Sequence, residues 1–431
     1  MKLNRWMAPF LVSLTIILGF CLIQPSLSRL SETSRLSETS VFEEVWQTVN
    51  DSFYDPDLNG VDWVAIRDKY APKAAQALSH KAFAAIINQM LAELQTSHTH
   101  FYTQAEPAYY QLLGIFQDSR ALQEQLETFL PNGSIEYTGT GIFTQEIAGK
   151  TFIRAILDGS PAAQAGLKVG DQLLSVEGKP YESIQSFVDK AGQAVDVLIQ
   201  RSPEPSRARA IAMTPQKLDP STLFLDAMQA SIEVIERDDR KIGYIHIWSY
   251  AGDQYQQLLV ETLSYGQLSQ TDGLILDLRE GWGGASPKYL DIFTAQVPTL
   301  SFVGRDGNQN NIDYVWKKPA VMLVNQGSRS GKEILAYGFR KYDVGPVIGT
   351  QTAKAVVGGS PFLMSDGSLL YLAVADVFTD GKRLEGKGVK PDIEVPFPLP
   401  YAQGIDPQKE RAIEVVMAAV KETAPFAADR R

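Results

Sequence analysis

The segment AVMLVNQGSRSGKEILAYGF, residues 320–339, joins a strand signal to a helix signal through a short polar turn. The apolar run ending at Asn325 is typical of a buried strand, and the residues from Gly331 onward place apolar side chains at helical spacing. Ser328 and Ser330 therefore fall at a strand-to-helix turn. Such a turn presents a hydroxyl beside the unpaired N–H groups of a helix N-terminus. One serine is a candidate nucleophile, and the plainer alternative is that a serine only caps the helix.

The same alternation of strand and helix surrounds this segment. Apolar runs at 241–248, 273–279 and 346–349 are separated by amphipathic stretches. This pattern predicts an α/β layer arrangement with a largely parallel sheet, followed by a strand hairpin that turns at Asp366-Gly367. Ligands of such sheets bind beyond the carboxyl ends of the strands, where the serine turn is expected.

A glycine-rich loop, DLREGWGG at 277–284, follows a second predicted strand. Gly281, Gly283 and Gly284 allow the backbone to turn tightly and to approach a substrate carbonyl. One N–H from this loop and one after the nucleophile would form an oxyanion hole. Alone the loop is compatible with an ordinary turn, but together with the serine turn it favours nucleophilic catalysis.

A serine nucleophile needs a base, and the chain has only four histidines. His246 alternates within a strand and is expected to be structural, whereas His80 lies near a helix start and is expected in solvent. His98 and His100 lie just past a predicted helix. A histidine, with a pKa of about 6.5, can act as a base near neutral pH, whereas a lysine pKa must first fall by roughly 3 units.

Two further regions precede the α/β region. Residues 41–115 carry apolar stripes at helical spacing and predict a small helical domain. Residues 137–215 change to short strands and turns, with an amphipathic helix expected at 182–192. Within them, SPAAQAGLKVGDQLLSVEG at 160–178 and GTGIF at 139–143 resemble the signature and the carboxylate-binding loop of PDZ domains.

In that loop, backbone N–H groups could hold a peptide C-terminal carboxylate, and the strand edge beside the loop could accept the peptide as an added strand. The residues expected to bind the peptide are Gly139, Gly141, Ile142 and Phe143. The alternative is an ordinary hairpin without a ligand.

The N-terminus differs from the rest of the chain. Basic residues followed by an apolar run at 7–23 predict an export signal over 1–28, and an uncleaved membrane anchor is the alternative. A duplicated polar hexapeptide, RLSETS, predicts a linker over 29–40. Cys21, the only cysteine, lies within the signal, so disulfide and thiolate chemistry are not expected. The net charge of −10 argues against a nucleic-acid partner.

Together these features resemble the C-terminal processing (tail-specific) serine peptidases, a family that includes the tricorn-type peptidases, over about residues 41–398. The resemblance implies a multidomain α/β protein with a crotonase/ClpP-like core. No cofactor or metal is expected. The resemblance also implies protein or peptide tails as substrates. The predicted signal indicates an exported protein, in a periplasmic or other extracytoplasmic location, with anchoring in a membrane by residues 7–23 as the alternative. The expected divisions are a signal at 1–28, a linker at 29–40, a helical domain at 41–115, a PDZ domain at 116–215 with its core at about 137–215, and a protease core with a tail at 216–431.

Carried over to this chain, the family nucleophile falls on Ser330, and the oxyanion donors are the N–H groups of Gly331 and of Gly283 or Gly284. Tail-specific members use a lysine base, whose matching position here is Ala355, one residue after Lys354. Tricorn-like members instead use a serine–histidine pair and a late glutamate.

The favoured catalytic set is Ser97, His98, Ser330 and Glu385, with a Ser330–Lys354 dyad as the alternative base arrangement. A non-catalytic peptide- or ligand-binding protein on the same scaffold is the alternative of another class. Lys332, next to the nucleophile, is expected to point along the helix without a role.

Overall fold

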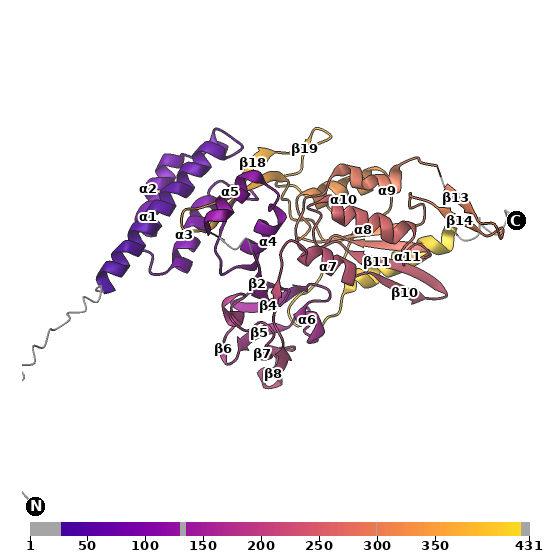
Figure 1. Cartoon of the computed structure of the whole chain (residues 1–431), viewed down its shortest axis with the longest axis horizontal. Coiled ribbons are helices and arrows are strands. Elements are labelled where there is room, and N and C mark those ends of the chain that lie inside the picture. The colour runs from indigo at the N-terminus through magenta and orange to yellow at the C-terminus, as the bar shows by residue number, and fades with distance from the viewer. Residues whose placement is uncertain (1–26, 130–134, 299, 424–431) are drawn as a thin grey trace, which may run out of the picture.

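The computed structural model describes residues 27–129, 135–298 and 300–423 (Figure 1). The predicted signal, including the apolar run at 7–23, lies outside the described residues except for its last two positions. None of the described helices is long and apolar enough to cross a membrane.

A six-stranded sheet forms the centre of the α/β core, in the order β10-β11-β12-β15-β16-β21. All neighbours are parallel except β10 and β11, so the predicted largely parallel sheet is confirmed. The strands are β10 Glu233–Arg237, β11 Arg240–His246, β12 Gly273–Asp277, β15 Ala320–Val324, β16 Val347–Gly349 and β21 Ile393–Glu394.

Helices cover both faces of this sheet because successive strand residues point to opposite sides. In β15, Val321 and Leu323 face the C-terminal helix α11, while Met322 and Val324 face the opposite layer. The helices are α7 Leu223–Ala230, α8 Asp253–Ser264, α9 Asp291–Thr294, α10 Gly331–Lys341 and α11 Pro407–Thr423, with a 3-10 turn at Pro287–Leu290.

The N-terminal helices share a hydrophobic core with a strand hairpin from the other end of the chain. That hairpin consists of β17 and β18, turns at Asp366-Gly367 as predicted, and pairs with the short strand β1. The elements are α1 Leu27–Ser52, α2 Trp63–Ala74, α3 His80–Ala92, β1 His100–Tyr102, α4 Pro107–Ile115, α5 Arg120–Phe129, β17 Val357–Leu363 and β18 Leu369–Asp376, with a 3-10 turn at Leu58–Gly60.

The segment 29–40 differs from the predicted linker, because α1 begins at Leu27 and runs through both copies of the hexapeptide. The residues of this segment are mostly polar, so the spacing of apolar residues does not reveal the helix. Serine, glutamate, leucine and arginine are all compatible with a helix that continues from the packed stripe starting at Val41.

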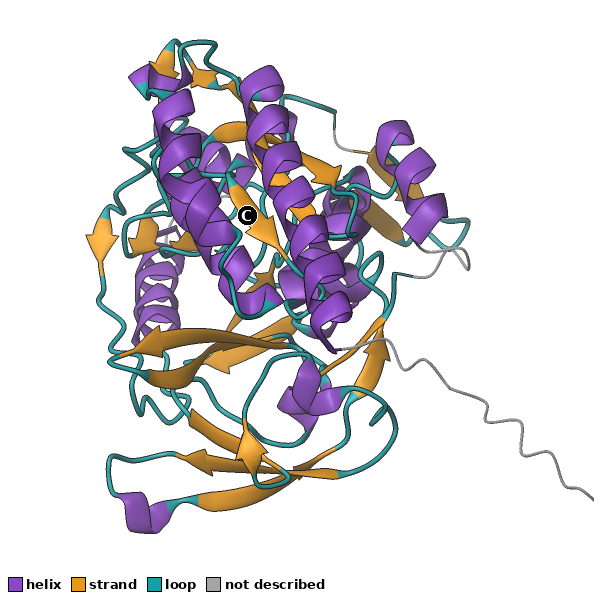
Figure 2. Ribbon diagram, turned by 90° about the vertical axis from the view of Figure 1, so that its left-hand side faces the viewer, coloured by secondary structure: helices purple, strands orange, loops and turns teal. Residues whose placement is uncertain are grey.

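The PDZ region forms a separate sheet in the order β3-β4-β5-β7-β8, with β6 on β5 (Figure 2). β3 is an edge strand, as peptide addition requires. The strands are β3 Ile142–Ile147, β4 Lys150–Ile156, β5 Gln172–Val176, β6 Lys179–Pro180, β7 Val195–Gln200 and β8 Arg209–Met213. They are accompanied by α6 Pro161–Gln164, a 3-10 turn at Pro205–Arg207, and the pair β2 Tyr137–Gly139 and β9 Gln216–Leu218.

The helix expected at 182–192 is wrong: only a 3-10 turn forms, at Gln185–Phe187. Ile184 and Phe187 both reach the interior within this one turn. The chain then becomes extended at Val188 and left-handed at Asp189, with φ of 58°, which ends the helical path.

Two small hairpins complete the described chain. β13 Leu300–Val303 pairs with β14 Gln309–Ile312, and β19 Phe378–Thr379 pairs with β20 Lys382–Arg383. The first projects from the end of the core farthest from the N-terminal helices (Figure 1).

Candidate active site

Ser330 lies at the turn between β15 and α10, where the sequence predicts it. Its φ of 57° and ψ of −128° place it in a region that non-glycine residues rarely occupy. The Ser330 N–H donates to Ala355 O at 2.8 Å, which holds the turn in place. Ser330 occupies the N-cap position of α10, but its hydroxyl makes no capping bond. The backbone thus holds the side chain while the hydroxyl is left available.

Ser328 points into the protein instead. Its hydroxyl donates to Leu278 O at 2.9 Å and accepts from Asn325 N–H at 3.0 Å, and its side chain is fully buried. Ser328 therefore fastens the turn to the end of β12 and is unavailable to a substrate.

Ser330 lines a cavity of about 340 Å³ that residues from distant parts of the chain surround. Polar and glycine residues on its wall include His98, Gly283, Gly284 and Arg329. The apolar wall consists of Leu112, Ile115, Phe116, Trp282, Val357 and Tyr371. The structure therefore brings the predicted serine, histidine and oxyanion loop to one cavity.

His98 is held by Ser97 and Glu385 on the side away from the cavity. Ser97 Oγ lies 2.9 Å from His98 Nδ1 and donates to Glu385 Oε2 at 3.0 Å. Because the Ser97 proton points to the carboxylate, Ser97 Oγ must accept a proton from Nδ1. His98 is then the Nδ1–H tautomer, and Nε2 carries the free lone pair that a general base needs.

Glu385 also accepts hydrogen bonds from the N–H groups of Ser97, at 2.9 Å, and Val356, at 2.6 Å. Val356 follows Ala355, which bonds to Ser330, so one short segment connects the nucleophile to the carboxylate. Glu333 of α10 fastens the same segment by accepting from Ala355 N–H at 2.7 Å and Lys354 N–H at 3.0 Å.

His98 reaches the cavity because β1 pairs with β18, two residues after it. A left-handed backbone, with φ of 54°, aims the ring, which packs against Tyr371 at 5.4 Å between centroids. Burial, together with the positive charge of Arg329, lowers the pKa of His98 to about 3. The imidazole is therefore neutral, the form that can accept a proton.

The glycine loop packs directly against the serine turn. A Cβ added to Gly283 would lie 2.5 Å from Ser330 Cβ and 3.2 Å from Gly331 N, so only glycine fits there. Within the described ranges, the N–H groups of Gly283, Gly284 and Gly331 have no protein acceptor. Unpaired amides beside a candidate nucleophile are the donors that an oxyanion hole requires.

Lys354 lies outside this cavity. Its side chain is exposed and does not line the wall that His98 and Ser330 share. Ala355, at the position of the family lysine, is buried and contributes only backbone groups.

Lys332 is a residue whose importance the sequence analysis missed. Its side chain is fully buried, and Nζ donates to Trp248 O at 3.1 Å and Glu280 O at 2.8 Å. Burial lowers its pKa to about 7, against the opposing effect of Asp277 and Glu280. Lys332 thus joins the loop at 248–252 to the oxyanion loop, and the expectation that it points along the helix is wrong.

The PDZ residues lie where the chain leaves β2 for β3. Gly139 pairs with Gln216 at the end of β2, and Gly141, with φ of 77°, makes the turn into β3. Ile142 enters the PDZ core, whereas the Phe143 ring lies parallel to Trp248 of the protease core at 6.0 Å. A cavity of only about 10 Å³ lies against these four residues.

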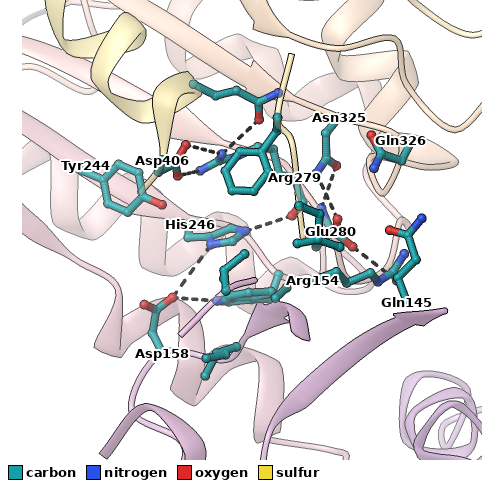
Figure 3. Close-up of a pocket in the computed structure, with 17 residues that line it drawn as sticks. Gln145, Arg154, Asp158, Tyr244, His246, Arg279, Glu280, Asn325, Gln326 and Asp406 are labelled. Carbon is teal, nitrogen blue, oxygen red and sulfur yellow. Dashed lines mark hydrogen bonds and ion pairs between the residues drawn. The ribbon is translucent and has the colours of Figure 1, made fainter. Parts of the chain in front are cut away.

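A second, more polar cavity of about 170 Å³ lies between the PDZ sheet and the core (Figure 3). Arg154 of β4 forms an ion pair with Glu280, within the glycine-rich loop at 277–284, at 3.2 Å. His246 bonds to Arg279 O at 2.9 Å and stacks on Trp248, in keeping with its expected structural role. His80, also as expected, is exposed.

The chain matches known families in three places. Residues 241–395 match Peptidase family S41, residues 36–92 match the Tricorn protease C1 domain, and residues 152–201 match a PDZ domain. The three matches follow the predicted order of helical, PDZ and α/β regions.

Two curated relatives span most of the chain. A carboxyl-terminal-processing protease of Synechocystis is 26% identical over 400 residues, covering 89% of this chain and 87% of that protein. Tricorn protease homolog 1 of Streptomyces coelicolor is 24% identical over 406 residues, but the chain spans only 35% of its length. The chain also aligns with the crystal structure of the tricorn protease, over 90% of this chain and 37% of that one, with a TM-score of 0.53 and 18% identity. This likeness shows the fold alone.

Fold and matches together define a serine-type peptidase with a helical N-terminal region, a PDZ domain and an α/β core. The α/β core thus matches peptidase family S41, and the relatives that span most of the chain are named carboxyl-terminal-processing and tricorn proteases, as the sequence resemblance implies.

Proposed function

We propose that the protein cleaves peptide bonds with Ser330 as the nucleophile and His98 as the general base. The observation that carries this proposal is the shared cavity: the strained serine turn, the neutral imidazole and the unpaired glycine amides all face one space. In the described chain no hydrogen bond joins His98 to Ser330, and such bonds are often long until a substrate closes the site.

In the acylation step, His98 Nε2 takes the Ser330 hydroxyl proton as Oγ bonds to the substrate carbonyl carbon. The N–H groups of Gly331 and of Gly283 or Gly284 stabilise the negative oxygen of the tetrahedral intermediate. The C–N bond then breaks, and His98 returns the proton to the leaving amine. Water, activated by the same imidazole, hydrolyses the acyl-enzyme and restores the serine.

Ser97 and Glu385 act through His98. Their hydrogen bonds fix the Nδ1–H tautomer and the ring orientation, and the carboxylate offsets the positive charge that the imidazole gains in the transition state. The exposed position of Lys354 favours this arrangement over a serine–lysine dyad.

The substrates that fit this site are proteins or peptides cleaved near their C-termini, with the PDZ domain binding the tail. The edge strand β3 and the turn at Gly141 support peptide addition. We further propose an exported, extracytoplasmic location, supported by the N-terminal sequence and by relatives named as cyanobacterial and chloroplast processing proteases.

An active-site serine probe tests the proposal directly. We expect it to label Ser330, and Ser330→Ala to abolish both labelling and peptide cleavage. Ser301→Ala, on the exposed strand β13, is the matched control and should retain both. Cleavage by Ser330→Ala at the parent rate would contradict the proposal and favour the non-catalytic alternative.

A further inference from the structure

We propose that Arg329 forms an anion-binding subsite in the catalytic cavity, which holds a substrate carboxylate within about two residues of the scissile bond. The inference rests on the proposed function of Ser330 and extends it to the class of substrate. Arg329 directly precedes Ser330, is half-buried, and lines the same cavity.

The Arg329 guanidinium is held in place but has no anionic partner. Its Cζ lies 5.0 Å from the centroid of the Trp282 ring, so the indole supports one face of the planar group. In the part of the chain that the structure describes, no carboxylate forms an ion pair with it. By contrast, Arg279 contacts two aspartates and Arg201 contacts Asp171. Stacking leaves the N–H donors at the guanidinium edge free for a bidentate bond.

The cavity is positively charged although the whole protein is negative. The described residues on its wall include no aspartate or glutamate, whereas the chain as a whole has a net charge of −10. The charge of Arg329 reaches groups around the cavity, because it adds to the lowering of the His98 pKa by burial and opposes the rise that burial causes in the pKa of Tyr371. A half-buried cation without an ion-pair partner, on a substrate-sized surface, favours an anionic ligand.

Chain geometry limits where that anion lies on the substrate. Consecutive Cα atoms are about 3.8 Å apart, and an extended peptide advances roughly 3.4 Å per residue. Because Arg329 and Ser330 line one cavity of about 340 Å³, we place the carboxylate within about two residues of the carbonyl attacked by Ser330. Either a free C-terminal carboxylate or the side chain of an aspartate or glutamate would supply it.

Matched peptides separate these sources. One pair differs only in a free or amidated C-terminus two residues after the cleavage site. The other pair is extended and differs only in Glu or Gln at a flanking position. We expect the parent to cleave at least one carboxylate form with a kcat/KM about tenfold higher than its neutral partner. Arg329→Gln should abolish that preference, and Arg329→Lys should retain part of it.

The ratio of the two kcat/KM values within each peptide pair reports recognition of the carboxylate alone, because a change in the His98 pKa alters both values equally. Arg305→Gln, on the exposed loop between β13 and β14, removes the same charge elsewhere and should leave the ratio unchanged. An unchanged ratio in Arg329→Gln, or the absence of any preference in the parent, overturns the proposal.

A binding measurement keeps this test independent of turnover. Fluorescence anisotropy of the same labelled peptides is compared between Ser330→Ala and Ser330→Ala/Arg329→Gln. The PDZ domain is present in both, so its own affinity for a C-terminal carboxylate cancels. A selective loss of about tenfold for a carboxylate peptide in the double variant supports the subsite, and equal affinities refute it. Failure of the parent to cleave any peptide would count against the proposed function, while the binding result still decides the role of Arg329.

Discussion

His98 is a buried imidazole that a serine and a carboxylate hold as one tautomer. We expect His98→Ala to lower kcat by about 10²- to 10⁴-fold, because the general base is lost. Lys354→Ala, at an exposed side chain, should change kcat by less than about twofold, since surface substitutions rarely perturb a site. Steady-state peptide kinetics measure both. A dead Lys354→Ala beside an active His98→Ala would instead identify the lysine as the base.

Burial of Lys332 should make the free energy of unfolding depend on pH. The pKa of Lys332 falls from 10.5 in the unfolded chain to about 7 in the folded protein, so the unfolded state binds more protons between these values. The free energy of unfolding should therefore rise with pH from about 7 to 10.5 relative to Lys332→Met. Denaturant titrations of both proteins across this range test the sign. Parallel curves would show that Lys332 is not buried as a titrating group.

Among single residues, Ser330 can be predicted from the sequence, because a strand-to-helix turn is visible in the residues around it. The sequence could not show that Lys332 points inward. Its carbonyl partners, Trp248 and Glu280, belong to loops that only the folded sheet brings together. Arg329 was overlooked for the same reason: no spacing rule shows that a cation faces a cavity.

Among the elements, the glycine-rich loop at 277–284 packs directly against Ser330. Gly283→Ala should lower kcat sharply with little change in overall secondary structure, because the new Cβ would meet Ser330 Cβ at 2.5 Å and Arg329 O at 2.8 Å. Gly304→Ala is the matched control, because its new Cβ comes closer than 3.0 Å only to the end of the flexible Asp306 side chain. Peptide kinetics and circular dichroism distinguish a local shift from unfolding. Full activity in Gly283→Ala would place the oxyanion hole elsewhere.

The sequence predicts the core strands β11, β12, β15 and β16 and the helices α8 and α10, because their apolar patterns match the packing of the layers. It does not predict β10, α7 or α11. It fails at 182–192, where a short apolar spacing satisfies a 3-10 turn as well as a helix. It gives no sign of the helix at 29–40, where polar residues precede the packed part of α1, which begins at Val41. The pairing of β1 with β18, which delivers His98, is non-local and has no signal in either segment alone.

For the whole molecule, an ion pair joins Arg154 of the PDZ domain to Glu280 in the glycine-rich loop of the core. Arg154→Gln removes the cation paired with Glu280, whose carboxylate stays buried. We expect faster amide hydrogen exchange in β4 and in the loop at 248–252, because this docking contact is weakened. Arg209→Gln, exposed on β8, should leave both segments unchanged. Equal exchange in all three proteins would show that the ion pair does not hold the domains together.

Ser97 and Glu385 are 288 residues apart, yet one hydrogen-bonded unit contains both. During synthesis, His98 and then Ser330 leave the ribosome before Glu385. The strand β21, which completes the sheet, and the helix α11, which packs on it, leave later still. A nascent chain that ends before residue 385 therefore contains His98 and Ser330 but lacks the carboxylate to which Ser97 bonds. Such an order would keep a young chain, and its neighbours on the polysome, from premature cleavage. A nascent chain stalled before residue 385 should accordingly fail to react with a serine probe that labels the finished protein.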